Sequence, residues 1–109
     1  MSYDEGLAER IRDVLAFRED ITEKKMFGGI AFLLGGNMCV GVVNDVLMVR
    51  VGAEACDAAL NEPHVRPMDF TGRPLKGFVY VDPDGIDDDE ALQAWIERGV
   101  AFAASLPMK

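Results

Sequence analysis

The sequence is poor in the residues that build metal centres and nucleophilic sites. It has one histidine, His64, and two cysteines, Cys39 and Cys56, which lie far apart and form no Cys-x-x-Cys pair. An HExxH motif and a histidine-rich zinc set are therefore excluded. A pair of His64 with either cysteine is arithmetically possible, but nothing local indicates an activated thiolate. We expect no catalytic residue, no metal ligand set, no cofactor, and two reduced cysteines that serve as small packing residues.

Long apolar runs and positive charge are also scarce. No segment is long and apolar enough to span a membrane, and residues 1–17 mix charged with apolar residues, unlike a signal peptide. We expect a cytoplasmic protein without membrane contact. The 19 acidic residues outnumber the 11 basic ones, which gives a formal charge of -8. Such a field repels phosphate backbones, so direct nucleic-acid binding is not expected.

What is present is the composition of one ordinary folded domain. The chain has 109 residues, of which 50% are apolar and 28% charged, enough for a single modest core. It contains no repeat, low-complexity segment or linker. We expect one domain over residues 1–109, with no second, helical domain after it.

Three segments have the apolar spacing of helices. The spacing of Leu7 and Ile11 continues along residues 4–17 and predicts an amphipathic helix with its charged residues on the other side. Residues 53–60 are a short helix candidate. The apolar residues of the segment 88–105 recur at spacings of three and four, which predicts a long closing helix whose apolar stripe lies on a sheet.

Short apolar segments separated by turn residues predict an antiparallel meander. Residues 35–37 (Gly-Gly-Asn) and 44–45 (Asn-Asp) suit tight hairpin turns. The stretch 61–77, rich in proline and glycine, is expected to be a loop. The fold class is therefore α+β, with an antiparallel β-meander sheet flanked by an N-terminal helix and a long C-terminal helix. The predicted strands are residues 30–34, 38–43, 46–51 and 78–81.

The central strands are apolar on both faces. In residues 38–43, alternation puts Met38, Val40 and Val42 on one face, and the other face is uncharged too. Such a sheet needs cover on both sides. Either the first and last helices straddle it, or one face or an edge strand binds a second copy or another protein. If two copies meet there, an outward residue such as Val42 or Met48 would lie in the contact.

The acidic and glycine-rich motifs have structural explanations. Residues 82–90 contain many carboxylates but lack the ligand spacing of an EF-hand loop. Asp87 as N-cap, with Glu90 three residues later, predicts a capping box at the start of the closing helix. The glycine pairs 28–29 and 35–36 match neither a P-loop nor a dinucleotide fingerprint. We interpret the first pair as a bulge or a site of close approach by another backbone, and the second pair as a hairpin turn.

A local reversal of charge is the candidate interaction site. Basic residues gather in the stretch 61–77 and just before the first strands, in a chain that is otherwise acidic. An acidic patch on a partner protein could dock there. Alternatively, these basic side chains form ion pairs with surface carboxylates, each of which adds little to the stability of the fold. The candidate interaction residues are Lys24, Lys25, Arg50, Arg66, Arg73 and Lys76.

A Met-Phe-Gly-Gly block, formed by Met26, Phe27, Gly28 and Gly29, opens the strand region. With this block, the chain resembles the N-terminal domain of TfoX-type (Sxy-type) competence regulators over roughly residues 5 to 105. The order Pro67-Met68-Asp69-Phe70 departs from the usual pattern, and Met48 stands where an aromatic residue is common. Other matching positions are Phe32, Leu47, Arg50, Met68 to Phe70, Lys76, Gly77 to Pro83, Leu92 and Trp95.

The resemblance implies an α+β domain with an antiparallel sheet, and a role in regulating natural competence genes where a helical C-terminal domain follows. Our leading hypothesis is a non-enzymatic regulatory or protein-interaction module of unknown biochemical role, with an unidentified protein partner or a second copy bound to it. The alternative is a small-molecule-binding protein or enzyme with a pocket between the closing helix and the sheet. That pocket would be lined by Met26, Phe27, Phe32, Tyr80 and Trp95.

We predict that the isolated protein binds DNA weakly and without sequence preference. The charge of -8 must be overcome, and no predicted helix concentrates lysine and arginine along one face. A gel-shift titration at near-physiological salt measures this binding. Sub-micromolar, sequence-dependent binding would contradict the prediction.

Overall fold

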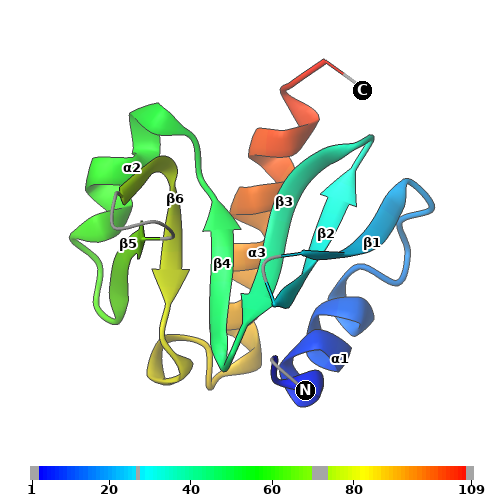
Figure 1. Cartoon of the computed structure of the whole chain (residues 1–109), viewed down its shortest axis with the longest axis horizontal. Coiled ribbons are helices and arrows are strands. Elements are labelled where there is room, and N and C mark those ends of the chain that lie inside the picture. Colours follow the sequence, from blue (N-terminus) through cyan, green and yellow to red (C-terminus); the bar gives the residue numbers. More distant parts are fainter. Residues whose placement is uncertain (1–2, 27, 70–73, 108–109) are drawn as a thin grey trace.

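The computed structural model describes residues 3–26, 28–69 and 74–107 and confirms the α+β fold class. No helix in these ranges is long and apolar enough to cross a membrane. The elements, shown in Figure 1, are α1 (Glu5–Val14), β1 (Ile21–Met26), β2 (Gly29–Leu34), β3 (Asn37–Val43), β4 (Val46–Arg50), α2 (Ala53–Leu60), β5 (Val65–Asp69), β6 (Pro74–Val81), a 3-10 turn η1 (Pro83–Gly85) and α3 (Asp89–Ala104).

The strands form one antiparallel sheet, which has six strands over the described residues in the order β1-β2-β3-β4-β6-β5 (Figure 1). The first four follow one another as the expected meander. Strand β6 then lies between β4 and β5, so the last two strands are reversed relative to the chain order. The sheet is wider than the four strands that the sequence pattern predicts.

The two strands that the pattern missed are the edges of the sheet. Strand β1 carries Lys24 and Lys25, and β5 lies inside the stretch 61–77 that was expected to be a loop. Pro67 of β5 removes a backbone donor, which only an edge position or a bulge tolerates well. Charges and proline at edges oppose pairing with other chains, and they also erase the alternation by which strands are recognised.

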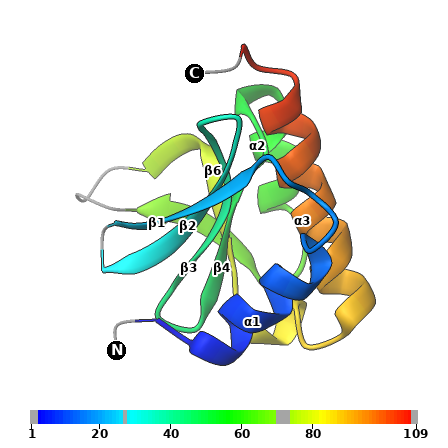
Figure 2. The ribbon, with the colours of Figure 1, turned by 90° about the vertical axis from the view of Figure 1, so that its right-hand side faces the viewer.

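The helices of the described chain lie on one face of the sheet, as Figure 2 shows. Helix α3 packs along β3 and β4, α1 packs against α3 and β3, and α2 covers β5 and β6. The arrangement in which the first and last helices straddle the sheet is therefore wrong. Helix α1 is held beside α3 by Arg10, whose guanidinium donates to the Ile86 carbonyl at 2.8 Å and pairs with Asp89 at 3.0 Å.

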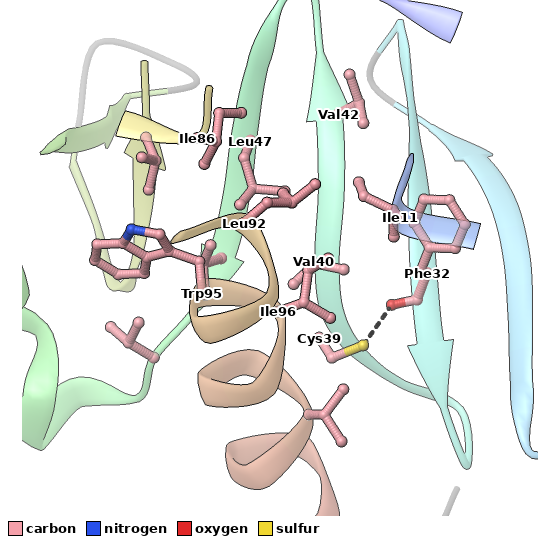
Figure 3. Close-up of a cluster of buried hydrophobic side chains, with 14 of the residues drawn as sticks. Ile11, Phe32, Cys39, Val40, Val42, Leu47, Ile86, Leu92, Trp95 and Ile96 are labelled. Carbon is pink, nitrogen blue, oxygen red and sulfur yellow. Dashed lines mark hydrogen bonds between the residues drawn. The ribbon is translucent and has the colours of Figure 1, made fainter. Parts of the chain in front are cut away.

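The main core fills the space between the helices and the sheet. In Figure 3, Leu92 and Ile96 of α3 lie beside Leu47 of β4 and Val40 of β3, and all four side chains are buried. Burying a side chain of this kind contributes about 1.5–3 kcal/mol. Trp95 belongs to the same core, and the Arg98 guanidinium lies 4.1 Å from the centre of its ring.

The start of α3 differs from the capping box predicted for Asp87 and Glu90. The N-cap is Asp88, and it makes no side-chain capping hydrogen bond. The carbonyl oxygen of Asp87 instead lies 3.4 Å from an Arg10 guanidinium nitrogen. Arg10 thereby fixes the segment that leads into α3, while the acidic first turn of α3 suits the positive end of the helix dipole.

Helix α3 approaches β3 closely because Gly99 faces the sheet. A Cβ at this position would overlap the carbonyl oxygen of Cys39 and lie 2.9 Å from Val40 Cγ1. The carbonyl belongs to the middle of a strand, so it cannot swing aside as a flexible side chain would. Glycine inside a helix costs about 1 kcal/mol relative to alanine, and the close packing offsets that cost.

We predict that Gly99→Ala lowers the free energy of unfolding by about 1–3 kcal/mol, because overpacking outweighs the better helix propensity. Chemical denaturation measures the change. Ala94→Gly, at an exposed position of α3, is the control and should cost about 1 kcal/mol through propensity alone. A Gly99→Ala protein that is more stable than the wild type would show that α3 does not need this close approach.

Candidate functional site

The face of the sheet opposite the helices has an apolar cluster of its own. Val46 and Met48 of β4, Met68 of β5 and Tyr80 of β6 are buried there. No helix residue of the described chain belongs to this cluster. We call this surface the open face, and it confirms that the central strands are apolar on both sides. The partly buried apolar side chains beside the cluster are Met38, Val43 and Phe78.

A β-bulge decides which side chains of β3 reach the open face. Phe32 pairs with Val40, but the next residue, Leu33, pairs with Met38, so Cys39 is the extra residue. Met38 therefore faces away from Val40 and Val42, contrary to strict alternation. Val42, expected as an outward residue, is wholly buried in the main core.

Met48, the other residue expected to face outward, does lie on the open face but is only 3% exposed. Its side chain covers Gly41 of the neighbouring strand, where the Met48 Cε lies 2.8 Å from the position that a Cβ would take. Met48 is thus part of the floor of the open face and does not protrude from it.

Strand pairing places one residue from each strand in a row across the open face. Residues directly opposite each other on antiparallel strands project from the same side of a sheet. The row has a lysine at the β1 edge, an arginine at the β5 edge and uncharged residues between them. We call it the open-face row. In strand order it contains Lys24, Ala31, Gly41, Met48, Tyr80 and Arg66.

Two of the three arginines expected at the interaction site, Arg50 and Arg66, already have neighbours. Arg66 Nε donates to the Asp82 carboxylate at 2.8 Å, and its guanidinium lies 5.3 Å from the Tyr80 ring centre. The Arg66 side chain remains 51% exposed, so this ion pair is screened and adds little stability. The Arg50 guanidinium lies 5.4 Å from the ring centres of both Phe78 and Phe102.

Lys24, Lys25 and Lys76 are exposed and make no ion pair with any described residue. Lys24 and Lys25 are neighbours on β1 and project to opposite sides. Lys24 belongs to the open-face row, whereas Lys25 pairs with Ile30, a residue of the main core. Lys76 lies on β6, and Arg73 is outside the described residues.

The expected basic site is therefore not one compact patch. Arg66 and Lys76 lie on strands and not in a loop, Lys24 is at the far edge of the sheet, and Lys25 projects to the helix side. The open-face row was not found from the sequence, because strands β5 and β6 and their register had to be known first. The residues at its two ends, Lys24 and Arg66, were both among the candidate interaction residues predicted from the sequence.

The Met-Phe-Gly-Gly block forms the connection between β1 and β2. Met26 ends β1 and pairs with Gly29 at the start of β2, while Phe27 lies outside the described residues. A Cβ on Gly29 would overlap the carbonyl group of Val42 on β3. For Gly29, the interpretation as a place of close approach by another backbone is confirmed.

The nucleophilic and ligand-type residues are not assembled into a reactive site. Cys39 is buried and lies 3.1 Å from the carbonyl oxygen of Phe32 (Figure 3), and Cys56 is buried in α2. Their hydrogen-bond partners are backbone carbonyls, and exposed His64 partners neither thiol. No histidine, cysteine, aspartate and glutamate side chains of the described residues form a group suited to a metal ion.

The described residues also do not form the expected pocket between the closing helix and the sheet, and Phe27 and the side chain of Met26 lie outside them. Phe32 and Trp95 belong to the main core on the helix side, whereas Tyr80 belongs to the cluster on the open face. Side chains on opposite faces of a sheet cannot line one cavity. The space under α3 is occupied by packed apolar side chains, as Figure 3 shows.

A feature that the sequence did not reveal is a groove between α1 and α3, next to an exposed phenylalanine. Phe17 follows α1, is 95% exposed and lines a hollow together with residues of both helices. Helical spacing predicted that α1 would continue to this residue, but the helix ends at Val14. Phe17 therefore lies beyond the helix, in the segment that leads to β1.

We predict that Cys39 reacts very slowly with thiol reagents in the folded protein. Burial raises the pKa of its thiol to about 11, so the thiolate at pH 8 is depleted roughly hundredfold relative to a free cysteine. Labelling of a Cys56→Ala variant with a colorimetric disulfide reagent, before and after denaturation, isolates this thiol. Labelling of the folded variant at the rate of a free thiol would reveal an accessible, activated cysteine.

Comparison with known proteins gives one finding. No curated protein and no solved structure matched the chain. The family model of the TfoX N-terminal domain matches residues 13–103. This range includes the six described strands, helix α2 and all but the last residue of helix α3. This match covers most of the chain and confirms the resemblance seen in the Met-Phe-Gly-Gly block. The chain therefore belongs to the TfoX N-terminal domain family.

Proposed function

We propose that this protein is a non-enzymatic, competence-regulator-like module of the cytoplasm that binds an acidic segment of a partner protein on its open face. The observation that carries the proposal is the open-face row, with Lys24 and Arg66 at its ends and uncharged side chains between them. Positive charge at both ends of a row is notable in a chain of formal charge -8.

The geometry favours a peptide segment over a nucleic acid. Five strand spacings of about 4.8 Å separate the ends of the row, so the backbones at Lys24 and Arg66 lie roughly 24 Å apart along the sheet. A segment of about seven extended residues spans that distance. Two cations are few compared with the 6–10 phosphate contacts typical of a DNA-binding protein, and the acidic chain repels a long phosphate backbone.

The middle of the open face supplies an apolar contact area. Met48 and Tyr80 form the floor of the row, and Met38, Val43 and Phe78 remain partly exposed beside it. Methionine side chains adapt their shape to different partners. An occupant that combines apolar side chains with acidic ones would bury these groups and meet Lys24, which has no ion pair in the described part of the chain.

Family membership supports the regulatory part of the proposal. TfoX N-terminal domains suggest a competence-regulator-like role. The charge of this chain makes it a poor DNA reader by itself, so its regulatory effect would pass through the protein that it binds.

We predict that Lys24→Glu weakens binding of a short fluorescein-labelled peptide, in which glutamate alternates with leucine, by roughly tenfold. The substitution replaces an attraction with a repulsion at the end of the row. Arg66→Gln should weaken binding about threefold, since it removes a screened charge. Fluorescence anisotropy at physiological salt measures the dissociation constants.

Lys25→Glu is the matched control, because it changes the net charge equally on the same strand but projects from the helix side. Binding by this variant should stay within about twofold of the wild type, since only long-range attraction is lost. Equal losses for Lys24→Glu and Lys25→Glu would place the peptide elsewhere. Tighter binding of a lysine–leucine peptide than of the glutamate–leucine peptide would reverse the proposed chemistry of the partner.

A further inference from the structure

Phe17 is the one large apolar side chain that the described residues leave strongly exposed. It is 95% exposed and lies just after α1, where the chain turns toward β1. A single surface phenylalanine needs no explanation by itself. Phe17, however, lines the polar end of the groove between α1 and α3, and the adjoining end of that groove is mostly apolar.

The groove between α1 and α3 consists of two adjoining hollows that share Val14 of α1 and Gln93 of α3. The first has a volume of about 480 Å³ and includes Phe17 in its lining. The second has a volume of about 340 Å³, and its apolar lining is Val14, Leu15, Ile96, Val100, Ala101 and Ala104. A cavity of about 150 Å³ suffices for benzene, so either hollow admits a phenyl ring.

Small side chains explain why the groove is present. Helix α1 has 10 residues and α3 has 16, and Figure 2 shows the two helices side by side. On the outer side of α3, the groove is bordered by Ala101 and Ala104, both exposed, which fill little space. Phe17 does not fill the groove of its own chain, because 95% of its surface stays accessible.

The rim of the groove carries charges of both signs. Arg10 and Arg18 face it together with Asp13, Asp89 and Glu97, so the charges nearly balance in a chain that is strongly acidic overall. Arg18 has only a long ion pair, 3.9 Å to Asp20, and is free to pair elsewhere. Arg10 already pairs with Asp89 of its own copy at 3.0 Å. A strongly acidic or strongly basic partner would meet like charges here, whereas a second copy offers Asp13 and Glu97 to Arg18.

We propose that two copies of this chain associate through the α1–α3 face, with Phe17 of each copy inserted into the groove of the other. Two-fold symmetry requires that a patch be complementary to itself, and here the projecting ring, the cavity and the mixed charges lie on one surface. The pairing takes the place of a dimer through the open face, which stays free for a partner. It does not depend on the proposed function, because none of its residues belongs to the open face.

The test is the association state in solution. The wild type should sediment with twice its chain mass of 11.9 kDa and dissociate on dilution. Phe17→Glu removes the inserted ring, and Ala101→Glu places a charged side chain in the cavity. Each should raise the dimer dissociation constant at least about tenfold, as expected for the loss of a central aromatic anchor.

Ala55→Glu is the control, because Ala55 is also exposed on a helix but lies on α2, away from the groove. Its dimer dissociation constant should equal that of the wild type. Thermal unfolding of each variant at a concentration where all are monomeric verifies folding, which exposed positions 17 and 101 should preserve. Phe17→Ala gives a second, uncharged version of the same test.

Three outcomes would overturn the inference. A wild type that remains at 11.9 kDa up to its solubility limit forms no dimer. A dimer that survives both Phe17→Glu and Ala101→Glu uses another surface. A dimer weakened by Lys24→Glu on the open face, but not by the groove variants, would return the contact to the sheet.

Discussion

The approach of α3 to β3 at Gly99 is the contact on which the rest of the structure depends. Because no side chain separates the helix from the Cys39 carbonyl, α3 lies deep enough for Leu92 and Ile96 to share one core with the central strands. Helix α1 then packs against α3 and not against the opposite side of the sheet. Three helices on one face of a six-stranded sheet, over the described residues, leave the other face without a helix.

The bulge at Cys39 links the two faces. The carbonyl group of Cys39 contacts α3 at Gly99, and its thiol lies against the Phe32 carbonyl. Because Cys39 is the extra residue of the bulge, Met38 points toward the open face. One inserted residue therefore serves the core and decides the composition of the opposite surface. The cysteine itself is a small buried side chain, in agreement with the raised pKa of its thiol.

Much of the fold could be predicted from the sequence, because its helices and inner strands have clear periodicity. Residues 53–60 form a helix as predicted, and the closing helix agrees within one residue at each end. The edge strands could not be predicted, because the lysines of β1 and the proline of β5 oppose pairing with further strands and also interrupt the alternation of apolar and polar residues that identifies a strand. The facing of Met38 and Val42 depended on a bulge, which follows from tertiary packing and has no local signal.

The candidate site was predictable only in its charges. The lysines and arginines were visible in the sequence, but their arrangement depends on a register that joins residues as distant as Lys24 and Arg66. Which arginines stack on aromatic rings, as Arg50 and Arg66 do, is likewise decided by strand pairing. Phe17 shows a different limit, because the predicted helix extended to this residue, whereas α1 ends at Val14 and leaves the ring exposed.

The charged and proline-containing edges of the sheet have a consequence for behaviour at high concentration. An apolar sheet surface is a hazard chiefly when an adjacent edge lets further strands add, since each added strand extends the surface into a fibril. Here Lys24 and Lys25 guard one edge, and Pro67 interrupts the other. The domain can therefore keep an apolar face accessible and still remain dispersed in a crowded solution.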